Sequence, residues 1–378
     1  MSWTLKLLTL LAEHKRLEVK ASRCLHERYK DSTCTKCTAV CPSPKALQVG
    51  EAVSYDASSC AECMQCVPVC PTQVFQNNQL KQQLQAALNR ESVAISCEQV
   101  GTKESHVQLP CLAQLELFHL LFAGLNSQNI SVWLNETRCE QCTLFRPGMF
   151  THLTGLISTA QSLLAAGKLG TQISMTTETQ AEKEQQQQYS RRELLSLLTA
   201  KSKDFSTSAA LSMLPLPGET VNIREKRTVP ETNRLLNHLV SRLAEDKALD
   251  LTVEAKYLKC ARVLAADSCT CCGVCTIFCP TGSLLLEVNE TGEKAVLSQN
   301  INKCVDCGLC REVCPEQAVS NEETVLLSDY LSSDPAAIFT RTLVRCKRCG
   351  NPALTGDWCD KCARKQRQEE SADGVFLY

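Results

Sequence analysis

The sequence predicts a multidomain chain of α+β and α/β folds, because three different patterns follow one another along its 378 residues. Cysteines crowd into two blocks, at residues 21–76 and 259–325, where tight runs close on Cys-Pro. Between the blocks, residues 80–178 alternate strand-like and helix-like apolar segments, which predicts a small central α/β domain with a parallel sheet. Two Cys-x2-Cys pairs within 341–364 predict a further small module.

Composition excludes several classes of protein. The chain has 26 cysteines and only 5% aromatic residues, and nearly all of the cysteines stand two or three residues apart. This spacing suits metal ligation and is poor for disulfides between distant elements. A formal net charge of −1 argues against a nucleic-acid-binding surface, so no nucleic-acid partner is expected.

The sequence shows no pattern of a signal peptide or of a transmembrane segment. A short apolar stretch near the start is followed at once by Glu13, His14 and Lys15, without a small-residue cleavage site, so we expect no signal peptide. No run approaches eighteen apolar residues, so we expect no transmembrane segment. A reducing, cytoplasmic location is therefore expected.

Two segments outside the cysteine blocks are expected to be helical. Leucines between Leu5 and Leu17 fall roughly on one side, which predicts an amphipathic helix over residues 1–20. Residues 179–258 are expected to be a helical linker region: they begin with a Gln-rich, charged stretch and end with a helix from Thr232 to Asp246.

Four cysteine runs close on Cys-Pro, and three of them are complete. The complete runs have the spacing Cys-x2-Cys-x2-Cys-x3-Cys-Pro and begin at Cys60, Cys269 and Cys304. The short loops let three thiolates converge on one face of an iron–sulfur cube. The proline ends the preceding helix and releases the chain into a strand.

These runs resemble those of bacterial two-cluster [4Fe-4S] ferredoxins, and the chain is similar to polyferredoxin-type iron–sulfur proteins. The resemblance implies two ferredoxin-like dicluster domains, in which the last cysteine of each run binds the cluster of the other run. It implies the following ligand sets: Cys269, Cys272, Cys275 and Cys314; Cys304, Cys307, Cys310 and Cys279; Cys60, Cys63, Cys66 and Cys41; and Cys34, Cys37 and Cys70 with one further residue.

The first run departs from the pattern, because Asp31 stands where its first cysteine is expected. Asp31 is one candidate for the missing ligand, through a carboxylate oxygen, which would give a labile cluster. Cys24 is the other candidate and the favoured one, since a soft thiolate suits the cluster better. In a third interpretation Cys24 is an ordinary core cysteine and this cluster is absent.

The central segment holds four more cysteines, each near the end of an expected strand. Cys97 ends the strand at 92–97, Cys111 follows the next strand, and Cys139 and Cys142 follow the strand at 129–135. Because the carboxyl ends of parallel strands share one crevice, these thiols are expected to meet at one site. The segment resembles the hydrogenase delta subunit, which implies a further cluster or metal here.

Two alternatives remain for the central cysteines. Cys139 and Cys142 alone would form a redox-active dithiol that cycles with a disulfide. Otherwise Cys97 and Cys111 are buried strand cysteines and the Cys-x2-Cys pair is incidental. A metal site needs all four residues, whereas a dithiol needs only two.

The tail has a zinc-ribbon spacing. Two Cys-x2-Cys pairs, joined by a short loop, offer the four thiolates that tetrahedral zinc needs: Cys346, Cys349, Cys359 and Cys362. A rubredoxin-like iron centre is the alternative, since its ligand set is the same. Cys260 and Cys271 lie outside every set and are interpreted as packed thiols.

The cofactors expected are thus four [4Fe-4S] clusters and one zinc ion, and with them electron transfer rather than catalysis. A cubane held by four cysteines has no open iron for a substrate, and its chemistry is one-electron exchange. The expected partners are redox proteins such as dehydrogenase, hydrogenase or reductase subunits. The alternatives are a redox-enzyme subunit that reacts at the central site, and a non-catalytic accessory or assembly protein of an oxidoreductase.

Overall fold

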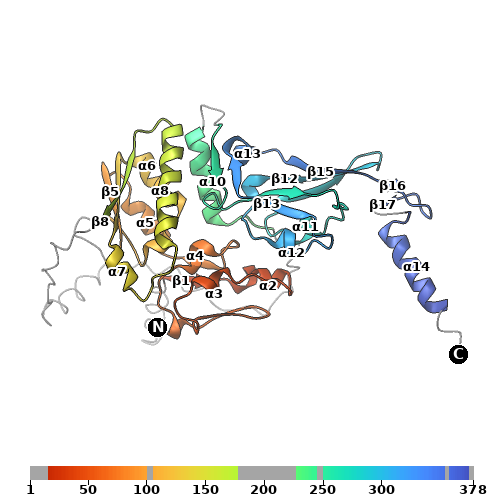
Figure 1. Ribbon diagram of the computed structural model, residues 1–378, viewed down its shortest axis with the longest axis horizontal. Helices are drawn as coiled ribbons and strands as arrows, with labels where there is room; N and C mark the ends of the chain where they lie inside the picture. Colours follow the sequence, from red (N-terminus) through yellow and green to blue (C-terminus); the bar gives the residue numbers. More distant parts are fainter. Residues whose placement is uncertain (1–15, 100–104, 178–226, 245–249, 354–356, 374–378) are drawn as a thin grey trace, which may run out of the picture.

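A computed structural model describes residues 16–99, 105–177, 227–244, 250–353 and 357–373. Its body combines a parallel sheet covered by helices with two smaller cysteine-rich units, and a thin C-terminal arm leads away from it (Figure 1). The two cysteine-rich units repeat one order of elements, strand–helix–hairpin–helix–strand, in which the outer two strands pair and the hairpin stands apart.

The first unit, which we call block 1, comprises β1 to β4. Strand β1 pairs antiparallel with β4, β2 pairs antiparallel with β3, and helices α3 and α4 contact each other. The elements are β1 (Leu17–Val19), η1 (Ala21–Arg23), α2 (Leu25–Arg28), α3 (Lys36–Val40), β2 (Leu47–Val49), β3 (Val53–Tyr55), η2 (Ala57–Ser59), α4 (Cys66–Val69) and β4 (Phe75–Asn77).

The expected N-terminal helix over residues 1–20 is wrong at its end. Residues 17–19 form strand β1, and Leu17 is buried while Glu18 is exposed. This alternation suits a strand, and pairing with β4 fixes it, so a tertiary contact overrides the leucine spacing. The rest of the expected helix, residues 1–15, lies outside the described residues.

The second unit, block 2, repeats the arrangement. Strand β10 pairs antiparallel with β13, β11 pairs antiparallel with β12, and α11 contacts α12. The elements are β10 (Arg262–Ala265), α11 (Val274–Phe278), β11 (Leu284–Val288), β12 (Lys294–Gln299), η5 (Ile301–Lys303), α12 (Leu309–Glu312) and β13 (Val319–Glu322).

Block 2 extends beyond the predicted limits of 259–325. Strand β15 (Ala336–Thr342) adds a third strand to the hairpin by pairing with β12. Strand β9 (Thr252–Glu254) pairs with β14 (Thr324–Leu326), and helix α13 (Leu327–Leu331) follows. The predicted limits followed the cysteines, and these added elements contain none.

The central unit is the predicted α/β domain with a parallel sheet. The strand order is β6-β5-β7-β8, and every neighbouring pair is parallel. Helices α6 and α8 contact each other beside the sheet (Figure 1). The elements are α5 (Leu80–Ala86), β5 (Ser92–Cys97), β6 (Val107–Leu109), η3 (Leu112–Gln114), α6 (Leu117–Asn126), β7 (Asn129–Leu134), α7 (Glu136–Glu140), α8 (Met149–Ala166) and β8 (Gln172–Thr177).

The described part of the expected linker region packs into the central core. Helix α10 (Glu231–Ala244) contacts α6 and α8, and it buries Leu236, Leu239, Val240 and Leu243 at helical spacing. The Gln-rich stretch before it lies outside the described residues.

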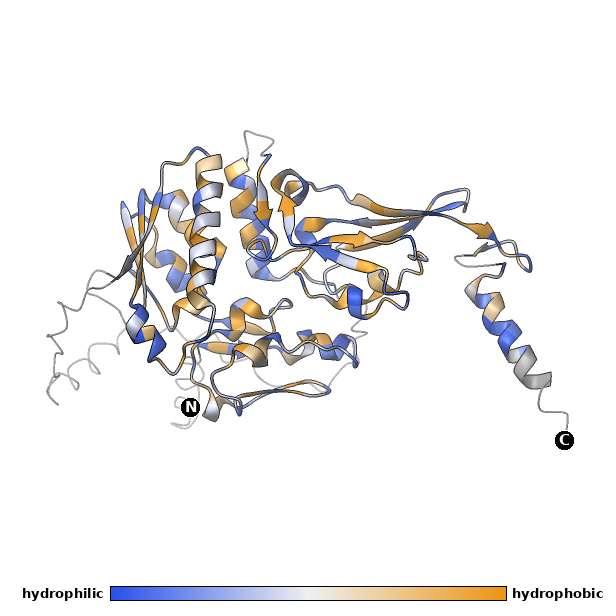
Figure 2. Cartoon of the chain, viewed as in Figure 1, coloured by the Kyte–Doolittle hydropathy of each residue, from blue (hydrophilic) through white to orange (hydrophobic). Residues whose placement is uncertain are grey.

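The tail leaves the body through β15. It consists of β16 (Val344–Arg345), its antiparallel partner β17 (Pro352–Ala353) and helix α14 (Asp360–Asp373). Figure 2 shows mainly hydrophilic residues on α14 and many hydrophobic ones on β12 and β15. The tail therefore depends on something other than an apolar core of its own.

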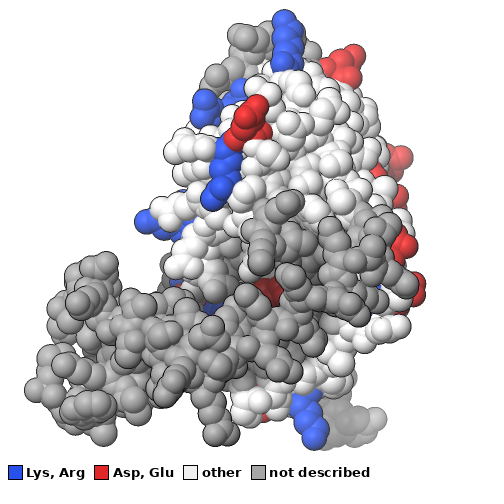
Figure 3. Space-filling model, turned by 90° about the vertical axis from the view of Figure 1, so that its left-hand side faces the viewer, with Lys and Arg blue, Asp and Glu red and all other residues white. Residues whose placement is uncertain are grey.

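The described residues also bear on membrane spanning and on surface charge. None of their helices is both long and apolar enough to cross a membrane. On the face shown in Figure 3, acidic and basic side chains are both scattered among neutral ones.

Candidate iron–sulfur and metal centres

The cysteine runs fold into loops with a shared backbone conformation. In each complete run the residue before the second cysteine has a positive φ: Glu62 at 49°, Cys271 at 53° and Asp306 at 46°. The residue after the second cysteine does so too, namely Met64, Gly273 and Gly308. Successive left-handed turns of this kind point backbone N–H groups inward, toward an anion.

Backbone amides of these loops donate to the cysteine sulfurs. Glu62 N–H donates to Cys60 Sγ at 3.3 Å, Val74 N–H to Cys70 Sγ at 3.3 Å and Ala318 N–H to Cys314 Sγ at 3.3 Å. Such bonds favour the thiolate and set the reduction potential of a bound cluster. The loops are therefore built for anionic sulfur.

In block 2 the thiols gather into two groups. The first group, site 4, surrounds Cys275: burial, and after it the charges of three neighbouring thiolates, raise the pKa of that thiol to about 12. The second group, site 3, surrounds Cys310, whose pKa is also raised to about 12 by burial and by neighbouring thiolates. Site 4 comprises Cys269, Cys272, Cys275 and Cys314, and site 3 comprises Cys279, Cys304, Cys307 and Cys310.

Block 1 shows the same crossed grouping. Burial raises the pKa of Cys66, and the next contributions come from Cys63, Cys60 and Cys41; these four residues form site 1. Burial raises the pKa of Cys37 to about 12, and the next contributions come from Cys70, Cys34 and Cys24; these four form site 2.

The grouping in site 2 bears on the missing ligand of the first run. The thiol of Cys24 lies among those of Cys34, Cys37 and Cys70, whereas Asp31 is exposed. The backbone differs here as well, because no residue between 31 and 45 has a positive φ. Cys24 thus occupies the fourth place in this group of thiols.

The four central cysteines line one cavity. The cavity lies beyond the carboxyl ends of β5, β6 and β7, and its lining includes Cys97, Cys111, Cys139 and Cys142. Burial raises the pKa of Cys139 to about 11, and Cys97 and Cys142 add to the rise. Burial also raises the pKa of Cys111 to about 12, and Cys97 again contributes. We call these four residues the central site.

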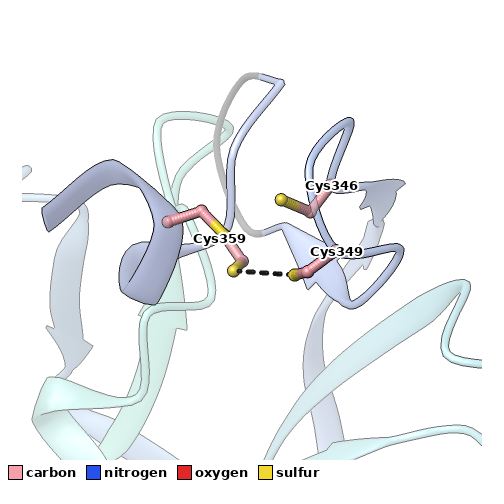
Figure 4. A group of neighbouring side chains, drawn as sticks. Cys346, Cys349 and Cys359 are labelled. Carbon is pink, nitrogen blue, oxygen red and sulfur yellow. Dashed lines mark hydrogen bonds between the residues drawn. The ribbon is translucent and has the colours of Figure 1, made fainter. Parts of the chain in front are cut away.

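The tail cysteines are closer together than those of any other group described here. Their four Sγ atoms lie within 4.8 Å of one another, and those of Cys349 and Cys359 are 3.5 Å apart (Figure 4). A tetrahedral zinc ion with bonds of about 2.3 Å spaces its thiolates by about 3.8 Å. A hydrogen bond from the backbone of Cys359 lowers the pKa of Cys346 to about 6. This group, the tail site, fits one metal ion.

The sites are neighbours of one another. Cys37 of site 2 contributes to the raised pKa of Cys66 in site 1, and Cys275 of site 4 contributes to that of Cys310 in site 3. Cys63 of site 1 contributes to the raised pKa of Cys111 in the central site. Each of these pairs therefore lies within electrostatic range.

Arg28 joins site 2 to site 3. It is 9% exposed and lies on α2, and its guanidinium donates to Phe278 O at 2.7 Å and to Cys279 O at 3.1 Å. Burial lowers the pKa of Arg28, whereas the thiolates of Cys279 and Cys307 raise it. Leu25 and Tyr29, on either side of it, pack into the apolar core of block 2.

Sequence reasoning missed three residues at these junctions: Arg28, Gln65 and Arg146. Gln65 is fully buried, and Arg146 lies within electrostatic range of Cys111 and Cys63. Gln65 stands inside a cysteine loop, which was the one available signal.

Cys260 and Cys271, interpreted as packed thiols, are 1% and 2% exposed.

Comparison with protein families identifies the kind of cluster. Residues 299–320 match the model of a 4Fe-4S binding domain, and this segment contains the whole run from Cys304 to Cys314. A search of curated proteins gives no match. The donor sets fit such groups, because the described thiols gather in fours. The chain therefore carries a 4Fe-4S binding domain and is an iron–sulfur protein.

Proposed function

We propose that this protein relays single electrons between redox partners through four [4Fe-4S] clusters, held by sites 1 to 4 in two ferredoxin-like dicluster domains. The observation that carries the proposal is the crossed grouping of thiols in both blocks, in which the last cysteine of one run joins the first three of the other. Cubanes held in this way supply one-electron exchange when bound.

Full ligation favours transfer over catalysis. Each of the four sites brings four thiols, one for each iron of a cubane, which leaves no iron position for a substrate. The surrounding backbone supplies N–H donors to sulfur, which is one means by which a protein sets a cluster potential.

The junctions give the relay an order: site 1, site 2, site 3 and site 4. Sites 1 and 2 share block 1, sites 3 and 4 share block 2, and Arg28 brings site 2 against site 3. Cys272 of site 4 is exposed, so this end of the series faces solvent and is the better place for a partner to exchange electrons.

The central site adds a fifth centre beside site 1. A dithiol needs only Cys139 and Cys142, and the gathering of Cys97 and Cys111 at the same cavity favours a metal or cluster instead. The proximity of Cys111 to Cys63 supports a position for this centre at the end of the series opposite site 4.

The tail site is proposed to hold structural zinc, as a zinc-ribbon module. Four thiols spaced for one ion, in a segment with a core of only a few residues, support this role. The arm that carries it leaves block 2 through β15, where Arg341 donates to Cys269 O of site 4. A redox partner subunit docked on the arm would thus lie near the exposed end of the relay.

The test is the iron, acid-labile sulfide and zinc content of protein purified without oxygen. The proposal predicts about sixteen iron atoms for sites 1 to 4, matching sulfide, one zinc ion, and additional iron for the central site. Iron near eight per chain would contradict the proposal, because one of the two blocks would then be empty.

A further inference from the structure

Gln65 stands between site 1 and the central site. It lies within the loop from Cys63 to Cys66, directly after Met64, whose φ of 61° turns the chain. Its exposed fraction is 0%, although glutamine is a polar residue that usually reaches solvent. A buried glutamine in a ligand loop calls for a specific role.

Hydrogen bonds connect Gln65 to both sites. Its backbone N–H donates to Cys63 of site 1. Its side-chain Nε2 donates to Cys111 Sγ of the central site at 3.8 Å and to Leu144 O at 2.5 Å. Leu144 N–H in turn donates to Cys142 Sγ at 3.4 Å. One residue thus bonds directly to a ligand sulfur of each site, and through Leu144 it reaches a second sulfur of the central site.

A purely structural role explains this arrangement poorly. The Oε1 atom of Gln65 is buried and has no hydrogen-bond partner among the described residues. Leaving such an acceptor unpaired is unfavourable, so packing alone would favour an apolar side chain here. The amide nitrogen, by contrast, uses its donors on the central site. The orientation of the side-chain amide therefore satisfies the acceptors of the central site and leaves the Oε1 atom of Gln65 unpaired.

We infer that Gln65 is a positioning residue that couples site 1 to the central site and raises the reduction potential of the central centre. An N–H···S bond stabilises the reduced, more negative centre more than the oxidised one. In the exchange itself, one electron leaves the cluster of site 1 and one arrives at the central centre, or the reverse, and no bond forms or breaks. The inference rests on the proposed relay and on a redox-active centre at the central site.

The test is a reductive titration of the full-length, iron-loaded protein followed by EPR. Gln65→Leu removes both side-chain donors and leaves the backbone bond to Cys63 intact. We expect the midpoint potential of the central centre to fall by about 40 mV. Losing one net hydrogen bond changes the equilibrium constant for reduction about fivefold, and about 59 mV corresponds to a tenfold change. Site 1 should keep its potential, and electron exchange between the two centres should slow.

Two further variants keep the test decisive. Gln65→Glu preserves the size of the side chain but replaces its donors with a negative oxygen, so the central potential should fall further. Gln83→Leu is the matched control: Gln83 is 6% exposed, and its side-chain oxygen accepts a hydrogen bond from Asn77 Nδ2 at 2.8 Å, with no cysteine involved. It should leave all potentials unchanged.

The outcomes separate this inference from the relay. An unmoved central potential in Gln65→Leu, or an equal shift in Gln83→Leu, overturns the inference and leaves the relay intact. A central site without a redox signal does the same. If the wild-type protein holds no cubanes, the proposed relay itself fails.

Discussion

Block 1 and block 2 share an order of elements but differ in how their first cluster site is completed. In block 2 every loop of both runs has the repeated left-handed residues, and every group is filled from within the runs. In block 1 the first run lacks those residues, and Cys24, outside the run, joins the group. The chain between Cys24 and Cys34 therefore contributes no thiol to this group.

This segment is one of the places where block 1 contacts block 2. It carries Leu25, Arg28 and Tyr29, all of which contact block 2, and Tyr29 stacks edge-on against Phe278 with ring centroids 5.4 Å apart. Thr33 Oγ1 then donates to Glu312 at 2.9 Å. Where the first run departs from the repeat, the chain therefore contacts block 2 in place of supplying a cysteine, and site 2 lies next to site 3.

The largest effect is expected from the ligand that distinguishes the blocks. Cys24→Ala should remove one cluster, about four iron atoms per chain, because site 2 loses a thiolate. Asp31→Ala is the matched change and should leave the iron content unaltered, since Asp31 is exposed. Iron and sulfide analysis measures both. The reverse result, with loss only in Asp31→Ala, would show that oxygen ligates this cluster.

The second-largest effect is expected at the Arg28 contact between block 1 and block 2. Arg28→Leu should lower the free energy of unfolding by about 3 kcal/mol, because buried carbonyls of Phe278 and Cys279 lose a charged donor. Urea unfolding measures this change. Arg23→Leu is the control, since Arg23 makes a 3.5 Å bond within block 1. Equal effects of the two substitutions would contradict the assigned docking role.

The contact of block 2 with the central domain should depend on pH, unlike the Arg28 junction. Lys259 pairs with Glu116 beside His119, and burial, followed by Lys259, lowers the pKa of His119 from 6.5 to about 3. Because the folded pKa is depressed, this stability is present above pH 6.5 and is lost as pH falls toward 3.

The loss is at most about 1.4 kcal/mol per pH unit. Urea midpoints at pH 7 and pH 5.5 should therefore differ less in His119→Gln than in the wild type. His238→Asn, at an exposed position of α10, should behave as the wild type does. An identical pH response in all three proteins would rule out His119 as the origin.

The smallest effect on the clusters is expected from the tail. Cys359→Ser should remove the tail metal and leave the iron content and EPR spectra unchanged, because the tail site shares no thiol with sites 1 to 4. Zinc analysis and EPR check this together. Loss of cluster iron in this variant would show that the tail supports block 2.

Local patterns in the sequence predicted the regular parts of the molecule. The strand expected at 92–97 is β5, and α6 and α8 are among the helix-like segments expected within 80–178, because alternation and helical spacing of apolar residues are local signals. The resemblance of the cysteine runs to those of two-cluster ferredoxins implied the crossed ligand sets, which stay a prediction. Strand β15 was missed because its partner β12 lies some forty residues away in the chain.

The junctions were beyond prediction for a related reason. Arg28 bonds to Phe278 across 250 positions, and Gln65 to Leu144 across 79. Neither hydrogen bond corresponds to a periodic pattern or a motif spacing in the sequence. Such contacts are properties of the assembled fold, and they decide which groups of cysteines are neighbours.

The central claim, an unbroken relay, is tested most directly by stepwise reduction of the iron-loaded protein with EPR detection at each step. A relay of four cubanes should take up at least about four electrons per chain, one for each cubane. Reduced neighbouring clusters should interact magnetically in the EPR spectra, including those of sites 2 and 3 across the two blocks. Uptake of fewer electrons, or spectra of magnetically isolated clusters only, would contradict it.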